Sequence, residues 1–309
     1  MKKTVFITGA LGHIGSRLIR DLSPKAVGRI IMLDNLESKR FASLYDLPKH
    51  FSYRFIEGDI RTADFDKLFE GVDMCIHLAA LSEAEKSVEY RTQVEEVNIE
   101  GLKRVVEGCI AKGVKLIFPS TTSVYGDRVP LVTEEGEIAP QSPYADSKFR
   151  GEEIIRSYKT KDLQFTIFRF ATIYGFSPGM RFSTAVNRFV WQAVTGQPLS
   201  VWKTALKQKR PYLALEDCVQ AINLILEKDI FKGEVYNVCT ENATVEDVVS
   251  TIKSFIPSTE IGLVDSKVMN SFSYDLVAKK IRALGFSPKG NLHSGVSEII
   301  EHFGRLTNL

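Results

Sequence analysis

The chain has 309 residues, of which 44% are hydrophobic and 25% charged, and its 40 Lys and Arg are nearly balanced by 38 Asp and Glu. These values are typical of a folded globular protein and exclude a disordered chain, a collagen-like repeat and a strongly basic nucleic-acid binder. No apolar run reaches the roughly 20 residues that cross a bilayer, so we expect no membrane segment. The four cysteines are scattered without a CxxC pair, which favours buried thiols in a reducing cytoplasm.

In the first half of the chain, short β-branched runs alternate with amphipathic segments of helical length. The runs predict strands at 4–8, 30–33, 53–56, 74–78, 115–118 and 165–168. Amphipathic periodicity predicts helices at 14–22, 65–69 and 93–112. Continuous apolar strands that alternate with helices indicate a parallel sheet covered on both faces, the doubly wound α/β (Rossmann) pattern.

The second half is less regular. Residues 175–179 predict a loop, residues 183–195 and 245–255 predict helices, and residues 234–239 predict a strand. Thr244 is expected to cap the second of these helices. We therefore expect a smaller lobe of mixed structure after about residue 170, following the Rossmann pattern.

A glycine-rich turn follows the first strand. Gly9, Gly12 and Gly15 have the spacing GxxGxxG, and Asp34 ends the second strand about 20 residues later. Glycines in such a turn let the backbone approach a diphosphate, which lies on the helix N-terminus, and the acid accepts hydrogen bonds from a ribose. Because an acid repels a 2′-phosphate, NAD is favoured over NADP. A tight turn without ligand and a solvated Asp34 are the alternatives.

Further along, Tyr144 and Lys148 form a YxxxK pair. Residues four apart share a helix face, and an ammonium group beside a phenol lowers its pKa, so that Tyr144 would act as a general base toward a hydroxyl. The pair alone occurs often by chance, and without further context a surface tyrosine beside a lysine is the favoured interpretation. Residues 119–126 place hydroxyl groups just after a predicted strand, at the sheet edge where ligands bind in such folds.

With these motifs in this order, the chain resembles the extended short-chain dehydrogenase/reductases of the NAD-dependent epimerase/dehydratase family, in particular the nucleotide-sugar epimerases similar to UDP-galactose 4-epimerase. The resemblance also rests on residues 58–60, 77–80, 98–101, 151–152, 169–175 and 208–212. It implies a Rossmann domain for NAD at 1–170, to which 210–240 returns. It further implies a nucleotide-sugar-binding lobe at 171–209 and 241–309.

The resemblance also assigns residues to roles. It implies that Thr121 hydrogen-bonds the sugar hydroxyl, that Tyr144 is the base and that Lys148 holds the nicotinamide ribose. The expected cofactor contacts are Gly9, Gly12, His13, Ile14, Gly15, Asp34, Asn35, Asp59, Ile60, Leu78, Ala79, Ala80, Asn98, Tyr144, Lys148, Phe170 and Ile173. The expected substrate contacts are Thr121, Ser123, Tyr144, Thr172, Arg181 and Arg210. For Arg181 and Arg210, solvated positions are the alternatives.

Two departures from the family pattern narrow the reaction. Family 4,6-dehydratases carry an Asp-Glu pair where this chain has Thr122 and Ser123, and decarboxylases commonly place a Glu at the second position. Without a carboxylate for elimination, the pattern fits a 4-epimerase that passes the C4 hydride to NAD⁺ and takes it back on the other face. Thr172 stands where the family often has Asn, which leaves the substrate pose open.

Two other functions remain open on the sequence. A nucleotide-sugar dehydrogenase or ketoreductase would use the same motifs, and a non-catalytic NAD-binding regulator would need fewer of them. No metal, nucleic acid or membrane partner is expected. The resemblance implies a homodimer formed by helices 93–112 and 142–158, although both helices could instead bury only intramolecular surface.

Overall fold

The computed structural model describes residues 2–126, 130–265 and 273–304. Its centre is a parallel sheet of seven strands in the order β11-β7-β5-β4-β1-β2-β3. The strands are β1 (Lys3–Thr8), β2 (Val27–Asp34), β3 (Ser52–Glu57), β4 (Met74–His77), β5 (Lys115–Thr121), β7 (Phe165–Phe170) and β11 (Glu234–Val238). The strand order reverses between β1 and β4, which is the switch point where doubly wound folds bind ligands. The predicted fold class is confirmed.

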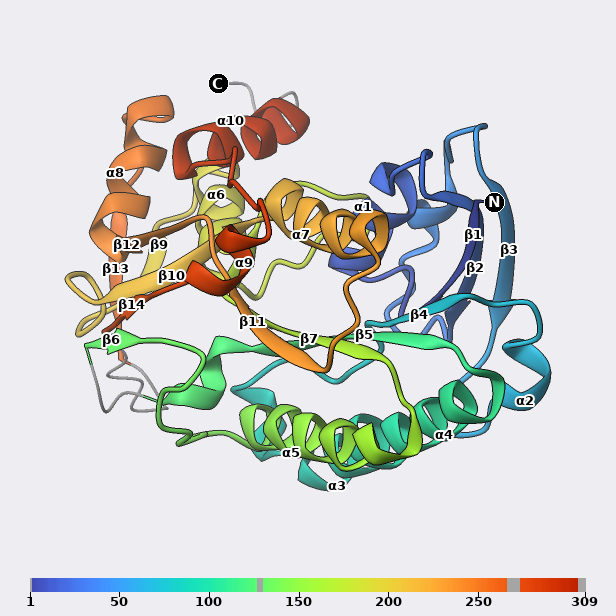
Figure 1. Ribbon diagram of the computed structural model, residues 1–309. Helices are drawn as coiled ribbons and strands as arrows, with labels where there is room; N and C mark the ends of the chain where they lie inside the picture. Colours follow the sequence, from blue (N-terminus) through green and yellow to red (C-terminus); the bar gives the residue numbers. More distant parts are fainter. Residues whose placement is uncertain (1, 127–129, 266–272, 305–309) are drawn as a thin grey trace.

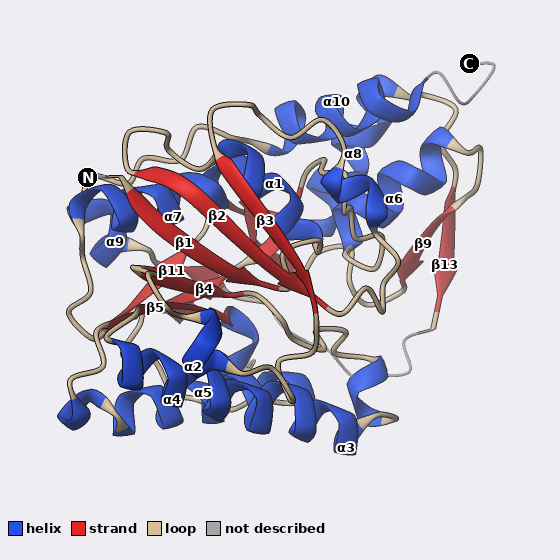
Figure 2. Ribbon diagram, turned by 90° about the vertical axis from the view of Figure 1, so that its right-hand side faces the viewer, coloured by secondary structure: helices blue, strands red, loops and turns tan. Residues whose placement is uncertain are grey.

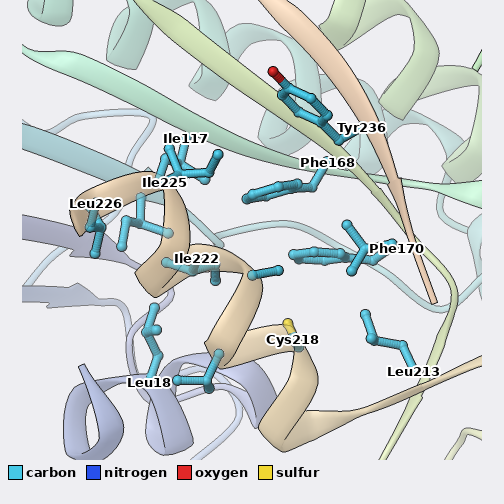
Figure 3. Close-up of a cluster of buried hydrophobic side chains, with 14 of the residues drawn as sticks. Leu18, Ile117, Phe168, Phe170, Leu213, Cys218, Ile222, Ile225, Leu226 and Tyr236 are labelled. Atoms are coloured by element: carbon cyan, nitrogen blue, oxygen red, sulfur yellow. The ribbon is translucent and has the colours of Figure 1, made fainter. Parts of the chain in front are cut away.

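Helices cover both faces of this sheet (Figures 1 and 2). On one face lie α1 (His13–Asp21) and α7 (Leu215–Lys228), and on the other lie α2 (Phe65–Leu68), α4 (Leu102–Lys112) and α5 (Pro143–Ser157). Alternate residues of one strand therefore enter different cores: Val5 and Ile7 pack toward α1, whereas Phe6 packs toward α2 and α4. Figure 3 shows the first core, in which Phe168 and Phe170 of β7 face Cys218 and Ile222 of α7.

The predicted helix 93–112 is not one regular helix. It comprises α3 (Arg91–Val94), a π-helical stretch η3 (Glu95–Gly101) and α4. The π-helical stretch lies where Asn98 turns inward to bond other segments and where Gly101 packs against Ile60; a Cβ atom on Gly101 would lie 2.6 Å from Ile60 Cδ1. Such stretches often occur beside functional sites.

The second lobe is built from short strands around three helices (Figure 1). Its helices α6 (Ala185–Val194), α8 (Val245–Phe255) and α10 (Leu292–Phe303) share one apolar core. Two predicted helices are thus confirmed, and Thr244 caps α8 in a capping box with Asp247. Its strands form three small sheets: β12-β10-β8, β13-β9 and β14-β6. These strands are β6 (Leu131–Val132), β8 (Thr172–Tyr174), β9 (Leu199–Trp202), β10 (Lys209–Ala214), β12 (Glu241–Thr244), β13 (Ile261–Val264) and β14 (Asp275–Leu276).

The connections contain short helices and one longer loop. They are the 3-10 turns η1 (Phe41–Leu44), η2 (Lys86–Val88), η4 (Thr122–Tyr125) and η5 (Lys159–Lys161), together with α9 (Lys279–Ala283). The longer loop joins β8 to α6 and is called the β8–α6 loop here (residues 175–184). In the part of the chain that the structure describes, no helix is long and apolar enough to cross a membrane.

Candidate active site

The glycine turn brings three different backbone constraints together. Gly9 has a φ of 64°, and a Cβ atom there would lie 2.6 Å from the Ala79 amide nitrogen. A Cβ atom on Gly15 would lie 2.5 Å from the Ala10 carbonyl oxygen, so only glycine lets α1 pack so closely. Gly12 is the N-cap of α1, with no side-chain cap and no acidic residue in the first turn. The first N–H groups of α1 therefore have no side-chain acceptor, and the partial positive charge of the helix N-terminus is available to bind an anion.

Asp34 joins this turn to the end of β2. Its Oδ2 accepts from the Leu11 amide at 3.0 Å and its Oδ1 from the Leu36 amide at 3.0 Å. Each carboxylate oxygen has a second lone pair with which it can accept from a ribose hydroxyl. The residue thus orders the turn and suits the predicted ribose contact.

Two further predicted cofactor residues, Asp59 and Ile60, lie just after the carboxyl end of β3, and a third, Asn35, lies just after β2. Asn35 Nδ2 donates to Asp59 Oδ2 at 3.4 Å, and Arg61 pairs with the same carboxylate at 2.7 Å. This hydrogen-bonded Arg61 lowers the pKa of Asp59 to about 2. Ile60 is buried against Gly101. Asp59 is therefore an anionic acceptor at neutral pH.

The loop after β4 is held by buried polar side chains. Asn98 accepts from the Leu81 amide at 2.8 Å and donates to the Leu81 carbonyl at 3.0 Å and to Ser147 Oγ at 2.9 Å. This places Asn98 as the support of the loop that carries Leu78, Ala79 and Ala80, which are partly buried. Its predicted contact with the cofactor stays a prediction.

The predicted catalytic residues meet at the end of β5. Thr121 is the last residue of β5 and Tyr144 lies in the first turn of α5, close enough for the Thr121 hydroxyl to lower the pKa of Tyr144. Ser142 caps α5 by accepting from the Ala145 amide at 3.1 Å, which fixes where the helix begins. Lys148 follows one turn later on the same helix. The YxxxK pair and the hydroxyl-bearing strand end thus form one cluster.

Burial dominates the electrostatics of this cluster. It raises the pKa of Tyr144, against the opposing effects of Arg181 and of the hydrogen bond with Thr121. Burial also lowers the pKa of Lys148 to about 7, although the nearby Glu152 carboxylate acts to raise it. The Lys148 ammonium lies 4.3 Å from the ring centroid of Phe118, a cation–π contact. Any further positive charge brought to Tyr144 would favour its phenolate.

A buried polar network beneath the cluster was not predicted as a functional feature. Glu152 accepts from Ser120 Oγ at 2.6 Å and from Arg169 Nη2 at 2.7 Å, and Arg169 Nη1 donates to Tyr125 Oη at 2.9 Å. Tyr125 in turn donates to Asn237 Oδ1 at 2.6 Å. The network ties β5, α5, β7 and β11 together directly behind Thr121, and so fixes the end of β5.

The predicted substrate residues do not all lie in one place. Ser123 lies beside Thr121, whose Oγ1 accepts from the Ser123 amide at 3.2 Å. Arg181 donates to Ser82 Oγ at 2.9 Å and to the Ser82 carbonyl at 3.0 Å, and its charge affects the pKa of Tyr144. Thr172 is half-buried in β8. Arg181 is thus close to the catalytic cluster, although in this structure it holds the loop after β4.

Arg210 lies on β10, which pairs with β8 and β12. It donates to Gln208 Oε1 at 3.0 Å, and burial lowers its pKa although Tyr212 and Tyr274 oppose this effect. Tyr274 donates to the Thr122 carbonyl at 3.2 Å, which connects the Arg210 neighbourhood to the catalytic turn. Tyr274 carries no motif and was not predicted.

Two predicted nicotinamide neighbours lie at the junction of the lobes. Ile173 is half-buried in β8. The Phe170 ring is stacked on Phe168 within the core, with centroids 5.2 Å apart, and the residue is 4% exposed (Figure 3). Any contact of Phe170 with a cofactor would therefore involve its main chain.

The β8–α6 loop lies against the glycine turn. Ser177 Oγ is 2.9 Å from His13 Nδ1, and the Gly179 amide donates to Ser16 Oγ at 2.9 Å. A Cβ atom on Gly179 would lie only 2.2 Å from the Leu11 carbonyl oxygen. Burial lowers the pKa of His13 to about 3, with nearby Arg181 adding to the effect, so its ring is neutral. The loop thus closes one side of the space above α1.

The sequence was compared with known proteins. The model of the NAD dependent epimerase/dehydratase family matches residues 5–239. The chain belongs to this family. Family members are NAD dependent, and the uncapped N-terminus of α1 beside Asp34 suits such a dinucleotide.

Relatives within the family include both epimerases and dehydratases. YtcB of Bacillus subtilis (strain 168), named an uncharacterized UDP-glucose epimerase, is 30% identical over 98% of both chains. The dTDP-D-glucose 4,6-dehydratase of Homo sapiens is 28% identical, over 97% of this chain and 90% of its own. The UDP-glucuronic acid 4-epimerase of Bacillus cereus, solved with UDP-glucuronic acid and NAD, has a TM-score of 0.90 and 26% identity, over 98% of this chain and 100% of its own.

Proposed function

We propose that the protein is an NAD-dependent nucleotide-sugar 4-epimerase. The observation that carries this proposal is the clustering of Thr121, Tyr144 and Lys148, with Thr122 and Ser123 rather than carboxylates directly after Thr121. Relatives of both reaction types exist, and elimination of water needs a carboxylic acid and base at the positions where dehydratases carry their Asp-Glu pair. Oxidation and reduction at one carbon need only a hydroxyl-directed base, which this cluster has.

The Rossmann domain, which we place at residues 1–170 with 210–240 added, would hold NAD. Gly9, Gly12 and Gly15 would let the diphosphate approach α1, with His13 and Ile14 in its first turn. Asp34 and Asn35 would contact the adenosine ribose and Asp59 and Ile60 the adenine; Leu78, Ala79, Ala80, Asn98, Phe170 and Ile173 would line the rest. When bound, NAD⁺ supplies a hydride acceptor that can return the hydride to the oxidised sugar.

Tyr144 would accept the proton of the C4 hydroxyl and later return it. Thr121 would hydrogen-bond the same hydroxyl and orient it toward Tyr144. Because burial raises the pKa of Tyr144, the phenolate needs positive charge nearby, which Arg181, a protonated Lys148 and the oxidised cofactor provide. The base would therefore become active once the site is loaded.

The lobe at 171–209 and 241–309 would bind the nucleotide sugar. Arg181 of this lobe and Arg210, the first residue of the returning segment 210–240, supply guanidinium groups suited to phosphate oxygens. Ser123 and Thr172 supply shorter hydrogen-bonding groups near the reacting sugar. These assignments are supported by the positions of Arg181 beside Tyr144 and of Arg210 beside Tyr274.

The decisive experiment incubates the protein with NAD⁺ and a panel of UDP-, GDP-, CDP- and dTDP-sugars. NMR should show inversion at C4 for at least one sugar, with no net NADH accumulating at 340 nm. Stoichiometric NADH without inversion would identify a dehydrogenase instead. Loss of water from C5 and C6 would identify a dehydratase, and no turnover of any sugar would favour a regulatory role.

We also propose a cytoplasmic homodimer that packs α4 and α5 against their copies. These helices lie side by side on one face of the sheet (Figure 1), and η2, which contacts α5, carries Val88 with 59% of its surface exposed. All four cysteines are free and buried, which suits a reducing compartment. Light scattering at micromolar concentration should give twice the chain mass, and a monomer would contradict the proposal; cell fractionation tests the location.

A further inference from the structure

Arg40 is an arginine beside the glycine turn that no sequence motif singled out. It precedes η1, which is fixed against the turn because Ser43 Oγ donates to the Leu11 carbonyl at 2.9 Å. Arg20 adds bonds to the carbonyl groups of Ser43 and Tyr45. A Cβ atom built on Gly12 would lie 3.8 Å from Arg40 Nη1. The Arg40 guanidinium is therefore held over the N-cap of α1.

Within the described ranges, no carboxylate forms an ion pair with this guanidinium, although Asp34 and Glu83 lie near enough to raise its pKa. No hydrogen bond or ion pair joins it to any residue there, although it is partly buried. The two nearest carboxylates are committed elsewhere: Asp34 accepts from two backbone amides, and Glu83 pairs with Lys86 at 2.8 Å. A partly buried cation without a partner costs free energy, which an anion would relieve.

A second positive charge lies next to it. Arg181 reaches Ser82 across the same space, and its side-chain hydrogen bonds to Ser82 and Ser183 all go to uncharged acceptors. The two guanidinium groups are close enough for Arg181 to lower the pKa of Arg40. By contrast, Arg17 is neutralised by Asp21 and Glu298. Two like charges that converge without an ion-paired carboxylate favour the binding of an anion.

We propose that Arg40 binds the diphosphate of the dinucleotide from a position beside the N-terminus of α1. A diphosphate presents oxygens on several sides, so the helix N–H groups would hold one side and the guanidinium another. The 2′-phosphate of NADP is the competing anion, but it would lie beside the Asp34 carboxylate, which repels it. This inference rests on the proposed NAD site and not on the proposed epimerase reaction.

The test measures binding alone, by calorimetry on protein freed of nucleotide, with NAD⁺, NADP⁺, ADP and adenosine as probes. R40Q should weaken the binding of NAD⁺ and ADP by about ten- to hundredfold, because a charge-assisted hydrogen bond is lost. The affinity for adenosine should stay unchanged. R40K should retain part of the affinity. R54Q, which removes an exposed arginine on β3, should match the wild type. Binding of NAD⁺ to wild-type protein should also weaken with salt more steeply than binding to R40Q.

Several results would overturn the proposal. If R40Q lost as much affinity for adenosine as for ADP, Arg40 would shape the adenosine pocket. A loss of affinity confined to NADP⁺ would instead assign Arg40 to the 2′-phosphate. A lower Tm of ligand-free R40Q would indicate a structural role, because removing an unpaired cation beside Arg181 should leave the Tm unchanged or raise it. If the wild type itself fails to bind NAD⁺, the proposed cofactor site fails first, whatever R40Q does.

Discussion

The ion pair behind the catalytic strand permits a quantitative prediction. Glu152 is 0% exposed and Arg169 2% exposed at their side chains, and they lie 2.7 Å apart. Changing Glu152 to Gln leaves a buried guanidinium without its main counter-charge, which costs about 3–5 kcal/mol. Since a domain is stable by only about 5–15 kcal/mol, this loss is large, and for a chain of 309 residues we expect E152Q to lower Tm by roughly 5–8 °C.

The assay is thermal unfolding of E152Q beside E153Q, whose neighbouring carboxylate is exposed on the same helix. The double variant E152L/R169M removes both charges and should recover part of the loss. Because Ser120 bonds Glu152 next to Thr121, E152Q should also lower kcat more than it changes KM. A fall in Tm no larger than that of E153Q would refute the reasoning that this pair is desolvated and essential.

Three further predictions concern the site itself. Y144F should lower kcat by about 10²–10⁴-fold while NAD⁺ still binds, and an unchanged kcat would remove Tyr144 from the reaction. Burial lowers the pKa of Lys148 from 10.5 to about 7, so ligand-free protein carries the full cost of the buried ammonium below pH 7 and loses it as pH rises to 10.5. K148M should therefore have the higher Tm at pH 6, with the difference shrinking toward pH 10; a constant difference in a scanning fluorimetry series would contradict this. G179A should weaken NAD⁺ binding, because its Cβ atom would lie 2.2 Å from the Leu11 carbonyl oxygen, whereas at Gly262 the nearest atom is 3.5 Å away. Calorimetry showing equal affinities for G179A and the control G262A would count against a role for the β8–α6 loop.

The central sheet was predictable because its strands are covered on both faces. The inner strands are then largely buried apolar runs, whereas the edge strand β3 is half-buried or exposed; all seven predicted runs form the sheet. The small strands of the second lobe had no such signal. β10 begins with Lys209 and Arg210 and contains Pro211, and β12 is mostly polar. Their pairing depends on the neighbouring lobe rather than on local pattern.

In the candidate site, too, some residues could be predicted from local motifs and others could not. The glycine turn and the YxxxK pair each depend on local spacing, so each can be found from the sequence alone. Arg40 lies in a polar segment without periodicity, and Tyr274 reaches Thr122 from a distant part of the chain. Tertiary contacts also override the predicted helix 93–112, because Asn98 turns inward to bond the loop after β4. Sequence patterns describe single elements, whereas these residues function through contacts between elements.

The attachment of α10 has a consequence for how the protein matures during synthesis. Glu298 binds Arg17 of α1 and the Phe176 amide, and His302 stacks on Phe176 with ring centroids 3.5 Å apart. The turn at Gly9 leaves the ribosome first, but the helix that braces the loop covering it is translated long afterwards. A nascent chain can therefore complete its sheet early and yet hold a dinucleotide firmly only once α10 has emerged. Acquisition of the cofactor would then report that translation has passed α10.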